Sequence, residues 1–298
     1  MTVNKLVLVD GNAILHRAFH ALPPLTTKRG EPINAVYGLV SMLLRVIQDL
    51  NPTHIGICFD RPEPTFRHKA FKQYQAQRPH MADELSSQFE KAKRVVEAFG
   101  IPAYEKAGFE ADDVIGTIAN KVKGEVVIVT GDRDQLQLVT DKVKVYMPIV
   151  GLANAKLMGE EEVIEKMGVA PKLVDDLKAL VGDPSDNYPG VPGIGPKTAI
   201  ALLEEFGTLD NIYKSIDEIP PRTADKLRQG RENSKISKKL ATIVKDVPIE
   251  FSLEDSAKWD VDSQKVLKLF SEFGFKTLTE RVKKVGKGLD EEKQIRLI

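Results

Sequence analysis

The sequence predicts an α/β protein with a mostly parallel central sheet, helices on both faces of that sheet, and a C-terminal α subdomain. Short apolar runs alternate with segments of helical periodicity as far as about residue 170, a pattern typical of parallel strands joined by helices. Beyond that point the strand signal fades while the helical signal continues. We therefore expect an α/β domain over residues 1–170, a helical subdomain over 171–285, and a polar tail or linker over 286–298.

Four apolar runs in the first part have the length of buried strands: Val3–Val9, His54–Phe59, Val126–Val129 and Val143–Met147. Apolar residues at helical spacing predict the helices between and after them: Asn34–Leu50, Leu85–Phe99, Asp112–Val122 and Glu160–Met167. The same spacing predicts the helices of the second part: Leu173–Val181, Pro196–Phe206, Ala224–Gln229, Ser237–Val244 and Gln264–Glu272. The chain from Lys284 onward is polar, which is typical of a frayed end.

The composition is that of an ordinary globular chain, with 298 residues, 42% hydrophobic residues and a formal net charge of zero. The balanced charge means that a nucleic-acid site would have to arise from local segregation of charge. The single cysteine, Cys58, excludes an intramolecular disulfide, and its apolar neighbours predict a buried, inert thiol. We expect no membrane span and no signal peptide, and hence a cytoplasmic protein.

The stretch Gly182–Ala199 combines two kinds of binding signal in a short segment. Its glycines, Gly193 and Gly195, allow a sharp turn and a close approach to a ligand, and Pro196 is suited to the first position of a helix. The free NH groups of that helix start, with Lys197 beside them, are suited to hold a phosphate. The alternative is an ordinary loop that precedes a capped helix.

Acidic residues follow several of the predicted strands and helix starts. In parallel sheets the carboxyl ends of the strands meet at one edge, where ligands bind. Nine carboxylates are expected there: Asp10, Asp60, Glu110, Asp112, Asp113, Asp132, Asp134, Asp183 and Asp186. Each one alone could equally serve a turn or a helix N-terminus.

Repulsion decides how such a cluster is to be interpreted. Two carboxylates 4 Å apart repel by about 1 kcal/mol in water and about 4 kcal/mol at an effective dielectric constant of 20, so the cluster requires cations. Ligands that are all oxygen indicate Mg²⁺, or Mn²⁺, rather than zinc. Two such ions would catalyse phosphodiester hydrolysis, and the sequence therefore predicts a two-metal nuclease.

Basic and aromatic residues alternate after the second predicted strand, between Arg61 and Arg94. Cations there can bind phosphates, and aromatic rings can stack on unpaired bases. The alternative is a solvated helix face, which charge runs commonly form. The residues are Phe66, Arg67, His68, Lys69, Phe71, Lys72, Tyr74, Arg78 and Lys91. A second basic run in the helical subdomain is equally compatible with duplex binding and with a solvated face: Arg222, Lys226, Arg228, Arg231, Lys235, Lys238 and Lys239.

Six motifs together identify a resemblance to a known family. They are LVLVDGN, NAVYG, FD followed by TFRHKAF, FEADDVIGT, TGDRDQLQL and GDPSDNYPGVPGIGPKTA. The chain resembles, from about Leu6 to Val282, the 5′ nuclease domain of bacterial DNA polymerase I, within the flap endonuclease superfamily. The resemblance implies a structure-selective 5′–3′ exonuclease and 5′-flap endonuclease of DNA replication and repair, located in the bacterial cytoplasm at the nucleoid.

The same resemblance implies further structure and partners. A helical arch over about 61–90 would admit a 5′ single strand, and a helix-three-turn-helix motif would hold the duplex and bind K⁺. The substrate would be DNA with a 5′ flap or 5′ end, with RNA–DNA hybrids as a further candidate. The protein would act as a monomer, either free-standing or fused to a polymerase domain.

Matching motif positions assign the residues. Asp10, Asp60, Glu110, Asp112 and Asp113 would surround the first Mg²⁺, and the second would be held by Asp132, Asp134, Asp183 and Asp186. Arg67 and Arg78 would contact phosphates near the cut. DNA would also contact Lys69, Lys72, Tyr74, Gln75, Gly193, Gly195, Lys197 and Thr198.

One departure from the family pattern concerns the arch, which usually contains Tyr-Lys-x-x-Arg. This chain has Tyr74-Gln75-Ala76-Gln77-Arg78, so a neutral amide replaces the expected lysine. The difference bears on the rate of cleavage more than on the class of reaction.

Two other functions compete with the nuclease hypothesis. A phosphatase-like enzyme would need a second aspartate two residues after Asp10, where this chain has Asn12. A structure-selective DNA-binding module with weakened catalysis is the stronger alternative, and Gln75 favours it, whereas the full set of acids argues against it.

Overall fold

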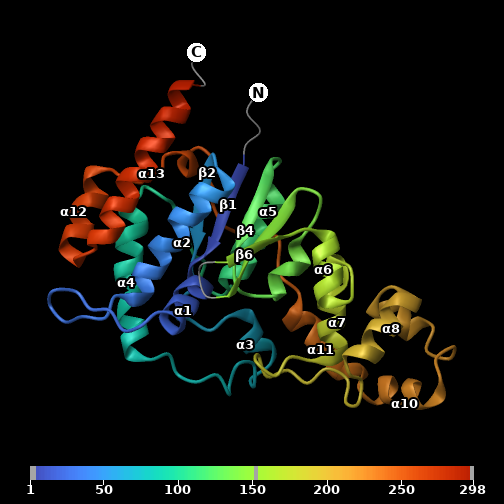
Figure 1. Cartoon of the computed structure of the whole chain (residues 1–298). Coiled ribbons are helices and arrows are strands. Elements are labelled where there is room, and N and C mark those ends of the chain that lie inside the picture. Colours follow the sequence, from blue (N-terminus) through green and yellow to red (C-terminus); the bar gives the residue numbers. More distant parts are fainter. Residues whose placement is uncertain (1–4, 151–153, 296–298) are drawn as a thin grey trace.

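The computed structural model describes residues 5–150 and 154–295, and its centre is a six-stranded sheet (Figure 1). The strand order is β3-β2-β1-β4-β5-β6, with β1 to β5 parallel and β6 antiparallel to β5. The strands are β1 (Lys5–Asp10), β2 (His54–Cys58), β3 (Ala103–Tyr104), β4 (Glu125–Val129), β5 (Val143–Val150) and β6 (Asn154–Met158). The predicted mostly parallel sheet is confirmed; Val3 and Asn4 of the first predicted strand lie outside the described residues.

Helices cover both faces of the sheet, as the alternation of β1 shows. Leu6 and Leu8 pack into one core with α5 (Ala111–Lys121), whereas Val7 and Val9 pack into a second core with α2 (Asn34–Leu50). Because successive side chains of a strand point to opposite faces, a strand buried on both sides is apolar throughout. The second core also takes in α1 (Gly11–Ala21), α4 (Asp83–Ala98), α12 (Gln264–Phe273) and α13 (Lys276–Ile295).

Five helices form the expected α subdomain beside the sheet (Figure 1), whereas α12 and α13, which were expected in it, pack into the second core of the sheet. They are α7 (Val174–Val181), α8 (Pro196–Phe206), α9 (Leu209–Lys214), α10 (Pro221–Gln229) and α11 (Arg231–Ala241). Helix α6 (Glu160–Met167) and the 3₁₀ turn η2 (Pro171–Leu173) precede them, and the 3₁₀ turn η3 (Asp255–Ala257) follows them. A further 3₁₀ turn, η1 (Asp134–Leu138), lies between β4 and β5. Helix α8 begins at Pro196, as predicted, because proline has no NH to lose at a first helical position.

The frayed polar tail that was expected from Lys284 is a helix in the structure. Helix α13 continues through Ile295, and only residues 296–298 of the expected tail lie outside the described residues. Leu278, Val282 and Val285 recur at helical spacing and are buried against α2, where Arg281 also donates a hydrogen bond to Ser41. A narrow apolar stripe anchors this helix although its other positions are polar.

The region predicted as an arch is helical only in part. Helix α3 (Phe66–Ala70) is followed by turns, and α4 begins at Asp83. Two features explain the break: Gln75 has a positive φ of 55°, and Arg78 precedes a proline, which disfavours the helical region. The turns pack against α11 through Tyr74, so the segment lies on the helical subdomain.

Among the residues that the structure describes, no helix is both long enough and apolar enough to cross a membrane.

Candidate active site

A cleft of about 880 Å³ opens at the carboxyl edge of the central strands. The expected convergence of acids occurs here, since seven of the nine predicted carboxylates line it. They are Asp10, Asp60, Glu110, Asp112, Asp132, Asp134 and Asp186. Asp183 reaches this group through Asp134 and Asp186, whereas Asp113 does not join it.

In one half of the site, the side-chain amide of Gln135 joins two of the acids, Asp10 and Asp112. Asp10 ends β1, caps α1 through the backbone NH of Ala13 at 2.9 Å, and accepts a hydrogen bond from Thr130 at 2.8 Å. The Gln135 amide donates to Asp10 at 3.1 Å and to Asp112 at 2.7 Å. Gln135 is fully buried, and its Oε1 has no hydrogen-bond partner within the described structure.

Gln135 was not among the predicted site residues although it stands in the TGDRDQLQL motif. The signal that could have identified it is a glutamine directly after Asp134, at the start of the apolar-rich run that ends the motif, because a buried amide must find charged or polar partners.

The start of helix α5 holds the next two acids. Asp60, just after β2, accepts a hydrogen bond from the backbone NH of Ala111 at 2.7 Å. Glu110 is the N-cap residue of α5 and accepts a hydrogen bond from the Tyr74 hydroxyl at 3.3 Å. The positive end of the helix dipole stabilises both carboxylates.

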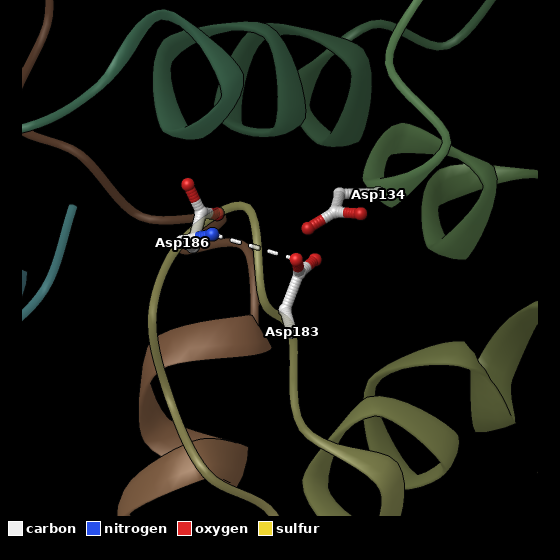
Figure 2. Close-up of side chains that lie close together, drawn as sticks. All are labelled: Asp134, Asp183 and Asp186. Atoms are coloured by element: carbon white, nitrogen blue, oxygen red, sulfur yellow. Dashed lines mark hydrogen bonds between the residues drawn. The ribbon is translucent and has the colours of Figure 1, made fainter. Parts of the chain in front are cut away.

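The other half of the site contains Asp134, Asp183 and Asp186, which each offer a carboxylate oxygen within 4.8 Å of one another. Asp134 comes from η1, and the other two come from the loop that follows α7 (Figure 2). The carboxylates of Asp134 and Asp183 point toward each other, and the Asp186 backbone NH donates to Asp183 at 3.4 Å. Asp132 stands at the exposed rim and accepts a hydrogen bond from the Asp134 NH at 2.8 Å.

Lys178 of α7 is a second residue that sequence analysis missed. Its ammonium lies between Asp134 and Asp183, forming an ion pair with each, at 2.6 Å from the Asp183 oxygen. Burial lowers the pKa of Lys178, but the two carboxylates more than offset this effect and leave it raised. In the sequence, Lys178 could have been identified as the single basic residue of the short helix α7, among apolar neighbours.

Asp113 is a correction to the predicted site, because it pairs with Arg67 instead of lining the cleft. Both are almost completely buried, and the guanidinium forms two parallel hydrogen bonds to the carboxylate at 2.7 and 2.8 Å. Arg67 also donates to the carbonyl of Leu240 at 2.8 Å, and Asp113 accepts from the NH of Val244 at 2.9 Å. Both oxygens of Asp113 are therefore engaged away from the cleft. Arg67 joins α3 to the helical subdomain, and where it borders the cleft it lies 3.3 Å from Glu110.

Tyr74, predicted to contact DNA, lines the cleft but is only 3% exposed. Its hydroxyl donates to Glu110 and, at 3.5 Å, to Asp186. Gln75 donates its amide to Asp186 at 2.9 Å, which ties the predicted arch to the second acidic group. Arg78 is exposed and lines the cleft, as expected, whereas Lys69 and Lys72 are exposed outside the cleft lining.

Burial and mutual repulsion raise the pKa of several of these acids. Burial raises the pKa of Asp10 to about 7, and the charge of Asp60 adds to the effect. Burial likewise raises the pKa of Glu110 to about 7 against the influence of Arg67, and that of Asp134 to about 7 with Asp132 adding to it. A divalent ion would remove this penalty, so the donor set fits such ions.

The predicted duplex-binding turn lies at the start of α8. Gly193 has a φ of 80°, which only glycine adopts readily, and Lys226 donates to its carbonyl at 2.8 Å. Gly195, Lys197 and Thr198 are exposed, and a side chain at Gly195 would meet open space. The turn thus presents backbone NH groups to solvent.

Family comparison identifies what this arrangement belongs to. Residues 5–168 match the model described as 5′-3′ exonuclease, N-terminal resolvase-like domain, and residues 169–264 match 5′-3′ exonuclease, C-terminal SAM fold. The chain belongs to the 5′–3′ exonuclease family. The predicted resemblance is confirmed, and curated relatives support it: DNA polymerase I of Bacillus caldotenax is 45% identical over 93% of this chain, and that of Bacillus subtilis is 41% identical. The chain spans about a third of their length, at 32% of each.

Solved structures of this family's fold superpose over almost the whole chain. The T5 5′-exonuclease with bound divalent metal ions (zinc) matches with a TM-score of 0.65 and 22% identity, covering 95% of this chain and 98% of the other. The catalytic core of Rad2 in complex with DNA substrate matches with a TM-score of 0.59 and 18% identity, covering 96% and 92%. These identities establish the shared fold.

The first prediction tests whether Arg67 has a structural role in addition to any contact with phosphate. Replacement of Arg67 by Met should lower the free energy of unfolding by about 3–5 kcal/mol, because Asp113 would be left buried without its partner. The exposed Lys69 of the same helix provides the matched control, and Lys69→Met should change stability by less than about 0.5 kcal/mol. Urea unfolding of both variants measures the difference, and equal stability would exclude the structural role of Arg67.

The second prediction concerns pH and the metal-free protein. Because the pKa of Asp10 is raised from its ordinary 3.8 to about 7, the folded state binds an extra proton between these values, and its stability falls as pH rises through them. Asp10→Asn lacks this charge, so it should gain stability relative to the parent as pH rises from about 5 to about 8. Calorimetric melting of both proteins in the presence of a chelator measures the difference in their stability at each pH. The contribution of the histidines is the same in both proteins and cancels from this difference. A difference that stays constant or shrinks with pH would contradict the prediction.

Proposed function

We propose that this chain is a structure-selective 5′–3′ exonuclease and 5′-flap endonuclease that hydrolyses phosphodiester bonds in DNA. The observation that carries the proposal is the convergence of seven carboxylates on one cleft in a chain of the 5′–3′ exonuclease family. The relatives are named DNA polymerase I, which supports a role in DNA replication and repair. The chain would act there as a monomer, either free-standing or as part of a longer polymerase.

Two divalent ions, Mg²⁺ or Mn²⁺, fit the oxygen donors of the cleft. One would be held by the half that contains Asp10, Asp60, Glu110 and Asp112. The other would be held by Asp134, Asp183 and Asp186, with Asp132 at the rim. Such ions, when bound, activate a water molecule and stabilise the departing oxygen.

The side chains around these acids position them or meet the substrate. Gln135 donates to both Asp10 and Asp112 and so fixes their separation. Gln75 donates to Asp186 and holds that carboxylate in place. Arg78 is exposed within the cleft and would bind a phosphate near the cut. Gln75 therefore acts on the acid rather than on the phosphate, in place of the cation that the family pattern expects.

The turn at the start of α8 would hold the duplex downstream of the 5′ end. Its exposed NH groups bind phosphates without reading bases, which suits a structure-selective enzyme and also an RNA–DNA hybrid. K⁺ would bind through backbone carbonyls of the turn other than that of Gly193, which already accepts from Lys226. We place the domain division at residues 170/171, with the duplex turn in the second domain.

The decisive test is the loss of cleavage without the loss of DNA binding. Asp112→Asn should slow Mg²⁺-dependent cleavage of a labelled 5′ flap by about 10³-fold or more, because an ion ligand is lost. Asp141→Asn, an exposed carboxylate in a turn before β5, is the control and should cleave normally. If the parent binds flaps but never cleaves them in Mg²⁺ or Mn²⁺, the weakened DNA-binding module is the correct function.

A further prediction concerns the duplex turn. Gly195→Ala should keep the fold, since its side chain meets open space, yet weaken binding to all duplex sequences alike by blocking backbone approach. Lys197→Ala should reduce the salt slope by about one phosphate contact. Gly288→Ala in α13, also in open space, is the matched control and should bind normally. Fluorescence anisotropy at several salt concentrations measures both effects, and a loss confined to certain sequences would contradict non-specific phosphate binding.

A further inference from the structure

Lys178 contacts two of the three carboxylates that could hold an ion in the second acidic group. The group that can offer three carboxylate oxygens to one ion consists of Asp134, Asp183 and Asp186. The Lys178 ammonium is in contact with Oδ1 of Asp134 and with Oδ2 of Asp183. Only 15% of the Lys178 side chain is exposed, so the ammonium sits inside the group rather than at its surface. An ion and this ammonium would compete for the same oxygens.

The two halves of the site differ in the kind of group that holds them. Asp10 and Asp112 are held by the neutral amide of Gln135, which adds no positive charge to them. The cation nearest this half, Arg67, lies 3.3 Å from Glu110 but is bound by two hydrogen bonds to Asp113. Asp134 and Asp183 are held by a full positive charge, which repels any further cation. The two halves should therefore bind divalent ions with unequal affinity.

We propose that the Lys178 ammonium takes the place of the second divalent ion in the DNA-free protein, so that this ion binds only after the ammonium has moved away. The inference rests on the two-ion site of the proposed function and deepens it. A lysine is suited to this role because its charge is compact and its four-carbon stem is flexible. Lys178 is then a positioning residue that keeps the acids together before the ion arrives.

The competing explanation is an ordinary structural ion pair that leaves ion binding unaffected. The same helix provides a direct comparison, because Lys238 of α11 pairs with Asp175 and Asp176 of α7 at 2.8 and 2.7 Å. Those two carboxylates lie outside the cleft lining. Lys238→Met therefore removes a similar ammonium from two carboxylates without touching the proposed ion site.

The experiment is a titration of the whole chain with Mn²⁺ in the absence of DNA, with bound ions counted by electron paramagnetic resonance. The parent should bind one ion tightly and a second weakly. Lys178→Met should tighten the second step by about tenfold or more, while Lys178→Arg, which keeps the charge, should leave it weak. Lys238→Met should behave as the parent. Circular dichroism confirms folding, and Lys178→Gln is used if the methionine variant does not fold.

Each outcome decides the matter. Tightening of the second step in Lys178→Met alone supports the inference. An unchanged or weaker second step in the folded variant overturns it while leaving the proposed nuclease intact, as would two equally tight ions in the parent. If neither the parent nor any variant binds Mn²⁺, the two-ion site itself fails, and this inference fails with it.

Discussion

The mutual repulsion of carboxylates at one edge of the sheet is the constraint on which the rest of this structure depends. Two such charges 4 Å apart repel by about 1 to 4 kcal/mol, depending on the local dielectric constant. The protein limits this cost in three ways: helix N-termini at Asp10 and Glu110, a neutral amide at Gln135, and buried cations at Arg67 and Lys178. Burial, with the charges of neighbouring acids adding to its effect, raises the pKa of Asp10 and of Asp134 to about 7.

The topology explains why the charges gather at all. Strands β1, β2 and β4 are adjacent and parallel, so the residues that follow them emerge at the same edge. The helical subdomain then supplies Asp183 and Asp186 from a loop after α7. A single apolar core cannot tolerate these charges, and the acids accordingly lie where the sheet ends and the cleft begins.

The sheet and most acids could be predicted from sequence because they depend on local signals. Apolar runs fix the strands, and an aspartate directly after a run, such as Asp10, must lie at the strand end. The sequence could also have predicted that Asp112 and Asp113 do not both line the cleft. Adjacent residues of a helix point about 100° apart, so they cannot both face one cleft. What separates them in fact is Arg67, whose partner Leu240 lies 173 positions away along the chain. Lys178 was missed, and Tyr74 was assigned to DNA, for the same reason: only tertiary contacts place these two residues beside the acids.

The contact between the arch segment and the second acidic group couples two parts of the site that are distant in sequence. Gln75 binds Asp186 through both its backbone NH, at 3.0 Å to the carbonyl, and its side-chain amide, and it adopts a positive φ to do so. A non-glycine residue in this conformation is maintained only where its contacts compensate the strain. A movement of the arch that broke them would relieve that strain and free the Asp186 carboxylate, while Lys178 would still hold Asp134 and Asp183. The predicted arch segment and the second acidic group therefore cannot change independently.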